Sequence, residues 1–260
     1  MEILNFSPDE IRVFTLILIR ISVVLFLFPI LGSPVFPPLA KMGLALIFTF
    51  VLFPVVKVDP ALFPKDAVQT VILMVSEFMI GMLLGLTVRF LFAAIQLAGQ
   101  VIGFQMGFSM INVVDPQSGD NVSITEQISF WIAMLVFLAI GGHHILIMAL
   151  VDSFSIINVG VFTIHAGFAQ KIIALSAEIF PLGIKIGAPA IAALLCTSAA
   201  FGICAKFVPQ MNIMIVAFPL KIAVGLAMIG VCFQIIIIVE RNFVSDFSDL
   251  LHNLMRWMAA

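Results

Sequence analysis

The sequence predicts an all-α membrane protein built from apolar helices. The chain of 260 residues is 63% hydrophobic and only 10% charged, whereas soluble domains are about 45–50% apolar and about 25% charged. Its mean hydropathy is +1.25. Six apolar segments can be marked along it, and most reach the ~20 residues that a membrane-spanning helix needs. The net charge of -2 argues against a nucleic-acid partner.

The six segments predict polytopic hydrophobic helical hairpins with kinked or broken helices. They are Ile11–Leu31, Leu39–Val56, Val68–Leu97, Ile128–Val151, Ile172–Val208 and Met211–Val239. Ser7 followed by Pro8 predicts a helix start. Pro181 and Pro189 predict a kink or break in the long fifth segment. Because no long polar linker interrupts the chain, we expect residues 1–260 to form a single domain.

Charge placement predicts an orientation if all six segments cross the membrane in alternation. The positive-inside rule then places both termini in the cytoplasm and the stretch from Gly99 to Asn121 on the outer side. The opposite side of the membrane from the termini collects only Lys41 and Lys206 with an acidic loop. The side of the termini collects Arg12, Lys57, Lys65, Lys171, Arg241 and Arg256.

Residues 99–121 join a helix suited to close packing to an apolar loop. Glycines spaced by four residues let helix backbones approach closely, and they occur at Gly81 and Gly85 and again at Gly99, Gly103 and Gly107. Methionine and phenylalanine side chains between the later glycines form an adaptable apolar surface. Asp115-Pro116 then forces a turn.

Five charged residues lie within apolar segments, and each needs a partner or water. An ionised side chain in lipid costs about 2.5–3.5 kcal/mol on insertion scales. Buried pairing between subunits, or snorkelling near a segment end, is the preferred interpretation, and an ion or proton pathway is the alternative. The five residues are Arg20, Glu77, Arg89, Lys185 and Lys221.

The sequence offers no catalytic constellation, and we predict neither an enzyme nor a cofactor. A phosphate-binding loop, a nucleophile elbow and a zinc-protease motif are all missing from the sequence. Adjacent His143 and His144 point about 100° apart on a helix, so a packed helix end is a better interpretation than a metal site.

Several motifs occur in a fixed order along the chain. They are Pro37-Pro38 with Lys41, Glu77-x-x-x-Gly81-x-x-x-Gly85, the central glycines with Asp115-Pro116, Gly141-Gly142-His143 before Ser153-Phe154, Pro209-Gln210-x-Asn212, and Phe218-Pro219-Leu220-Lys221 with Gly225. Together they resemble the FliR family, export-gate subunits of the bacterial flagellar type III secretion system, over essentially the whole chain. Asn158 in place of Pro and Lys206 in place of Arg are mild departures.

This resemblance implies a core subunit of a helical export-gate complex in the bacterial inner membrane and flagellar basal body. FliP-like, FliQ-like and FlhB-like subunits would be its partners, membrane lipid its surroundings, and unfolded flagellar proteins its cargo. The resemblance also implies that the segments are not simple spans and that the gate is raised toward the periplasmic side. The injectisome relatives, the SctT group, remain an alternative.

The resemblance further implies that the central loop is the plug of the pore. An apolar constriction excludes ions because none of its groups replaces their hydration shell. If the helix continues, Phe104, Phe108 and Ile111 share one face. The alternative is an ordinary external loop. The predicted plug residues are Gly107, Phe108, Met110, Ile111, Val113, Val114, Asp115, Pro116 and Gly119.

Two other classes of function compete with an export gate. A stand-alone transporter or channel would use broken helices with polar groups at mid-depth, and the region around Pro181 and Pro189 is the best sign of one. A purely structural membrane scaffold is the third possibility. Co-purifying partner subunits would separate the three.

Overall fold

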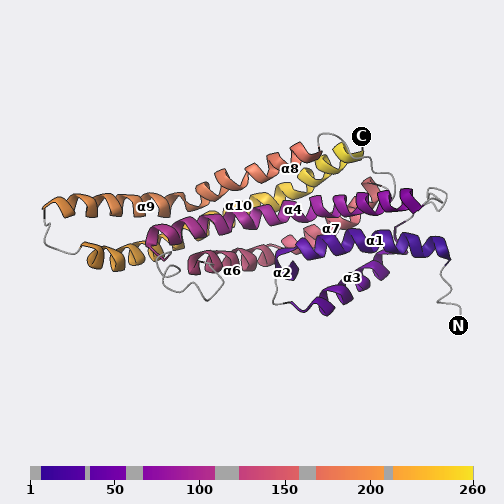
Figure 1. The fold of residues 1–260 in the computed structure, drawn as a ribbon, viewed down its shortest axis with the longest axis horizontal. Helices are drawn as coiled ribbons and strands as arrows, with labels where there is room; N and C mark the ends of the chain where they lie inside the picture. Colours follow the sequence, from indigo (N-terminus) through magenta and orange to yellow (C-terminus); the bar gives the residue numbers. More distant parts are fainter. Residues whose placement is uncertain are drawn as a thin grey trace. The chain divides into compact units, whose positions relative to one another are not determined.

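All the regular structure in the described residues is helical, which confirms the predicted all-α class (Figure 1). The computed structural model describes residues 7–32, 36–56, 67–108, 123–157, 168–207 and 213–259. The helices are α1 (Pro8–Leu27), α2 (Pro29–Gly32), α3 (Pro38–Leu52), α4 (Ala67–Met106), α6 (Ile124–Ala139), α7 (Gly142–Ile156), α8 (Phe168–Ala177), α9 (Ile179–Phe207) and α10 (Ile213–Ala259).

The predicted start of the first helix is confirmed in detail. The Ser7 hydroxyl accepts a hydrogen bond from the backbone N–H of Glu10, and the Glu10 carboxylate accepts one from the N–H of Ser7 at 2.7 Å. Pro8 occupies the first turn, where its missing N–H would have no partner within the helix.

Two long apolar segments are broken, and the break in the fifth lies one turn before Pro181, one of the two prolines that predicted it. The fifth breaks at Glu178, between α8 and α9. Pro181 falls in the first turn of α9, where proline is tolerated, and Pro189 lies inside α9 without ending it. The fourth segment, which hydropathy marks as one unit, breaks at Gly141, whose φ of 78° is left-handed. Helix α7 begins at Gly142, so a helix end does lie at His143 and His144, as their interpretation expected.

The prediction of six alternating spans is wrong for the described helices. Three stretches are long and apolar enough to cross a membrane: Val68–Met106, Ala169–Phe207 and Ile215–Phe247. The bent pair α6–α7 would make a fourth. The 15 residues of α3 extend only about 22 Å, short of the ~30 Å hydrocarbon core. The orientation predicted from charge assumed that six segments cross the membrane in alternating directions, so it no longer has that support.

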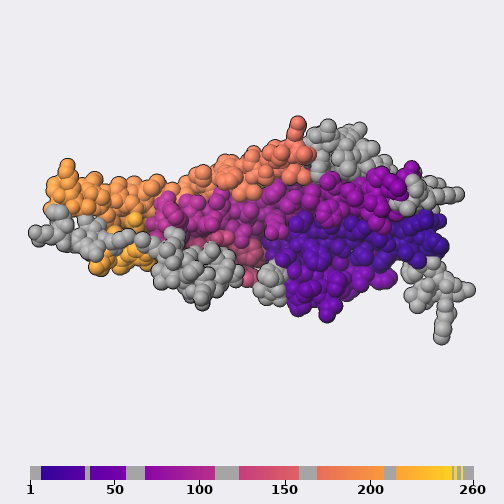
Figure 2. Space-filling view, viewed as in Figure 1, coloured from indigo at the N-terminus to yellow at the C-terminus, as the bar shows by residue number. Residues whose placement is uncertain are grey.

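The described helices form two units, each drawn from separated stretches of the chain. The first unit takes residues 1–90, 141–175 and 244–260. Within it α1 and α3 lie side by side (Figures 1 and 2). The Phe14 ring of α1 lies 4.9 Å from the Phe50 ring of α3, centroid to centroid. Leu16, Ile17 and Ile21 of α1 are buried.

The second unit takes residues 91–140 and 176–243. It contains the second part of α4, with α6, α9 and most of α10. At Gly183 of α9, an added Cβ would lie 2.9 Å from the backbone oxygen of Ala94 of α4, so these two backbones are in close contact. Helices α4 and α10 each run through both units without a break. The two units are therefore not shown to be separate domains, and the single domain stays a prediction.

Candidate functional site: the root of the central loop and a buried ion pair

Helix α4 ends at Met106 in a glycine-dependent stop signal. The N–H of Phe108 donates to the oxygen of Gly103 at 3.0 Å, and the N–H of Gly107 donates to the oxygen of Phe104 at 3.1 Å. These two bonds define a Schellman motif, which requires a left-handed residue after the helix. Gly107 supplies it with a φ of 92°. We call residues 103–108 the loop root, because they lie directly before the stretch predicted from the sequence as the central loop.

Helix α10 contacts the loop root at two glycine positions. A Cβ on Gly107 would lie 2.8 Å from ring atoms of Phe218, so the ring covers this glycine. A Cβ on Gly225 would lie 2.5 Å from the sulfur of Met106. The absence of a side chain at Gly107 makes room for Phe218 of α10, and its absence at Gly225 makes room for Met106 of α4. Close steric fit therefore fixes the position of the loop root against α10.

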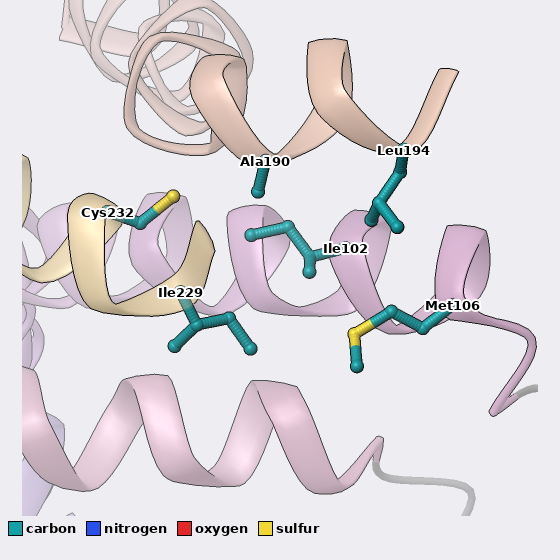
Figure 3. Packing of buried hydrophobic residues seen from close by; sticks show 6 residues of the cluster. All are labelled: Ile102, Met106, Ala190, Leu194, Ile229 and Cys232. Carbon is teal, nitrogen blue, oxygen red and sulfur yellow. The ribbon is translucent and has the colours of Figure 1, made fainter. Parts of the chain in front are cut away.

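An apolar cluster lies around the last two turns of α4 (Figure 3). Its buried members are Ile102 and Met106 of α4, Ala190 and Leu194 of α9, and Ile229 and Cys232 of α10. The side chains of all three helices point toward one another (Figure 3). Phe108 packs against the cluster from outside the helix.

On another side, α4 is joined to α6 through Gly99 and Gly103. The Thr125 hydroxyl donates to the backbone oxygen of Gly99 at 2.8 Å. A Cβ on Gly99 would lie 2.8 Å from Cα of Glu126 and from the oxygen of Thr125, both backbone atoms. At Gly103 a Cβ would overlap the hydroxyls of Ser123 and Thr125. Both glycines lie where the helices approach too closely for any side chain.

The predicted plug is only partly within the described residues. Gly107 and Phe108 belong to the loop root, whereas seven predicted plug residues lie outside the described residues: Met110, Ile111, Val113, Val114, Asp115, Pro116 and Gly119. Phe104, Phe108 and Ile111 would share one face only if α4 continued past them. That condition is not met, because α4 ends at Met106, directly before Gly107. Phe104 is 70% exposed, whereas Phe108 packs on the cluster.

Two of the five charged residues form a buried pair in the first unit. Arg20 of α1 and Glu77 of α4 are both 0% exposed, and the Arg20 Nε lies 2.6 Å from the Glu77 Oε2. Arg20 also donates to the Ser153 hydroxyl at 3.1 Å and to the backbone oxygen of Ile157 at 3.3 Å. The guanidinium lies 4.2 Å from the centre of the Phe154 ring. We call these five residues the arginine hub.

The arginine hub joins three helices at a close contact. Ile157 is the C-cap of α7, and a cation at a helix C-terminus satisfies a free carbonyl and complements the helix dipole. Beside the pair, a Cβ on Gly81 would lie 2.8 Å from the oxygen of Arg20, and one on Gly85 would lie 2.5 Å from Cβ of Leu27. These glycines let α4 approach α1.

The other three charged residues are not buried within the chain. Arg89 and Lys185 are exposed, and Lys221 is half-buried. The single chain leaves part or all of each side chain uncovered, so full burial would require a neighbouring molecule. The expectation that these three residues are buried by pairing between subunits stays a prediction.

Three polar positions of this region were not singled out as site residues from the sequence. Thr125 and Ser153 are common helix residues, and only their partners, Gly99 and Arg20, make them distinctive. Glu240 is buried in α10, but the predicted segment ended at Val239. The only signal for Glu240 was its position directly after that apolar run.

Known proteins resemble this chain over most of its length. The family of bacterial export proteins, family 1, matches residues 11–247. The flagellar biosynthetic protein FliR of Bacillus subtilis (strain 168) is 33% identical over 97% of this chain and 98% of its own length. The protein of the same name from Escherichia coli (strain K12) is 31% identical over 92% of this chain and 90% of its own length. The one from Aquifex aeolicus (strain VF5) is 29% identical over 88% of this chain and 88% of its own length. The chain belongs to the family of bacterial export proteins, family 1.

Proposed function

We propose that this chain is a core subunit of the flagellar protein export gate in the bacterial inner membrane. Its similarity to flagellar biosynthetic proteins over nearly the full length supports this assignment. In the proposal, FliP-like, FliQ-like and FlhB-like subunits complete the gate, and unfolded flagellar proteins pass through its pore. The apolar loop of residues 107–119 plugs the closed pore.

The observation that carries the plug proposal is the chemistry of the loop root. A pore for polypeptide must hold its plug firmly in one position and still release it. Contacts between helices at the loop root pair Gly107 with the Phe218 ring and Gly225 with Met106, within an apolar cluster. Apolar contacts of this kind exclude water and ions. Their separation breaks no ion pair, so opening faces no large electrostatic cost.

Exposed apolar side chains support membership of a complex. The most apolar 18-residue window of α10 is only 22% buried, and that of α9 is 28% buried. Phe180, Leu195 and Ile203 of α9 are among the exposed residues. Lipid or neighbouring subunits must cover these surfaces.

Co-purification tests the gate against its rivals. We expect the tagged chain, isolated in mild detergent from its own cell, to bring FliP-like and FliQ-like subunits with it. A homogeneous preparation of this chain alone that transports a solute would instead support a transporter. A stable partner complex with neither secretion nor transport would support a scaffold.

Deletion of residues 107–119 tests the plug within an assembled gate. The proposal predicts normal assembly with higher ion leakage, seen in cells as increased sensitivity to salt. Unchanged leakage in an intact complex would contradict it and support an ordinary external loop.

A further inference from the structure

Helix α10 carries a fully buried carboxyl group, that of Glu240. Glu240 is 0% exposed, and neither Oε1 nor Oε2 has a hydrogen-bond partner within the described part of the chain. Glu77, also fully buried, differs because it meets Arg20 at 2.6 Å. An ionised carboxylate left unpaired in a dry interior costs several kcal/mol. Glu240 therefore needs a ligand that neutralises it.

On the buried face of α10, no side chain other than that of Glu240 carries an oxygen atom that could bind a metal ion. Gly225, Ile229, Cys232, Ile236 and Glu240 are spaced by four, three, four and four residues, and they form the buried face of α10. A calcium or magnesium ion needs several oxygen ligands, and the described residues contain no group of three or more candidate metal ligands. A proton is the one cation that a single carboxyl group holds alone.

Within the described helices of the second unit, no charged side chain forms a hydrogen bond with Glu240. Residues 91–106 of α4 contain no ionisable side chain. The remaining acidic and basic residues of this unit's described helices are Glu126 on α6, Glu178 before α9, Lys185 and Lys206 on α9, and Lys221 and Arg241 on α10. Lys185, Lys206, Glu178 and Arg241 are exposed, Glu126 and Lys221 are half-buried, and none bonds to Glu240.

We propose that Glu240 is a proton-binding site, occupied while α10 is packed in the observed position. Loss of the proton breaks the O–H bond, passes the proton to water and leaves a carboxylate. That carboxylate is stable only where water or a cation reaches it, so α10 must leave its packed position for Glu240 to ionise. The protonation state of this residue and the packing of α10 are therefore linked.

Helix α10 also connects the protonation state of Glu240 to the loop root. Helix α10 is continuous from Ile213 to Ala259, and its buried face also carries Gly225, which receives Met106. Gly225 and Glu240 are separated by about 22 Å along the helix axis. A shift of α10 on ionisation would thus loosen the contact at the end of α4. Only this last step, coupling to pore opening, depends on the proposed function.

Infrared spectroscopy of the purified complex tests the proton site directly. A protonated carboxylic acid has a C=O stretch that a carboxylate lacks. The difference spectrum between wild type and Glu240→Gln at neutral pH should show the loss of one acid C=O band. Glu178→Gln, which removes an exposed carboxylate, is the matched control and should leave that band in place.

Each outcome decides the proposal. Glutamine has the shape of a neutral glutamic acid, so Glu240→Gln should yield the complex in wild-type amount, and failure to fold would contradict a neutral residue at this position. A difference spectrum with a carboxylate band and no acid band would overturn the proposal, because Glu240 would then be ionised beside an unseen cation. Neither result depends on whether residues 107–119 plug a pore.

Discussion

The arginine hub and the loop root fix helices by opposite means. In the hub, a charged side chain meets a carboxylate, a hydroxyl, a carbonyl and an aromatic ring, all within one buried site. In the loop root, α10 meets α4 through glycines and apolar side chains. Buried ion pairs are costly to break on one side, whereas close apolar contacts separate without leaving a charge exposed. The hub is suited to a permanent joint and the loop root to a releasable one.

The strongest way to break this contrast is to remove one member of the ion pair. Glu77→Ala would leave the Arg20 guanidinium buried without its carboxylate, which costs about 3–5 kcal/mol. We expect a large loss of free energy of unfolding and of complex yield, measured by thermal unfolding and by yield in detergent. In complexes that do assemble, ion selectivity should change little.

Two variants serve as controls for the ion pair. Replacing both members with apolar residues, Arg20→Met with Glu77→Leu, should cost much less than Glu77→Ala, because no unpaired charge remains. Arg89→Ala, at an exposed position of α4, should have little effect. Equal losses in the single and double variants would show that the pair acts through packing alone.

A second variant tests the close approach of α4 and α6. Gly99→Ala would place a Cβ 2.8 Å from backbone atoms of Glu126 and Thr125, and overpacking of this kind costs about 1–3 kcal/mol. Gly202→Ala is the matched control, since nothing lies within 4 Å of the Cβ position there. It should stabilise its helix by about 0.5–1 kcal/mol. Similar unfolding temperatures for the two variants would contradict the packing account.

A third variant weakens the loop root alone. Gly107→Ala must adopt a left-handed φ, which costs roughly 1–2 kcal/mol for a residue with a side chain, and its Cβ would meet the Phe218 ring. We expect complex yield to stay near normal while ion leakage rises. Gly43→Ala provides the control, because Gly43 has no atom within 4 Å of its Cβ position. Loss of assembly without leakage would place Gly107 with the permanent joints.

The smallest effect on the chain itself is expected at Lys221. This half-buried residue of α10 has no ion pair in the part of the chain described by the structure, so Lys221→Ala should barely change the stability of the isolated subunit. If a neighbouring subunit supplies its partner, complex yield should fall more than ion selectivity changes. Normal yield with altered selectivity would instead favour an ion pathway.

The helical fold class could be predicted from the sequence, whereas the contact between Arg20 and Glu77 could not. Composition and apolar length predicted helices, and charges inside apolar segments identified Arg20 and Glu77 without showing that they meet, since they lie 57 residues apart. Glycine spacing identified Gly99 and Gly103, but their partners on α6 depend on tertiary packing. Hydropathy missed the break at Gly141 because a single left-handed residue leaves the apolar pattern intact.

The central claim is that an apolar loop, anchored at Gly107, seals the closed pore. Its most direct test is ion conductance of the purified complex in a planar lipid bilayer, comparing wild type with a full-length variant whose apolar residues at 110, 111, 113 and 114 are all replaced by serine. The account predicts a silent wild type and a conducting variant, because hydroxyl groups admit water where the apolar side chains exclude it. Equal silence in both, with intact assembly, would contradict the claim.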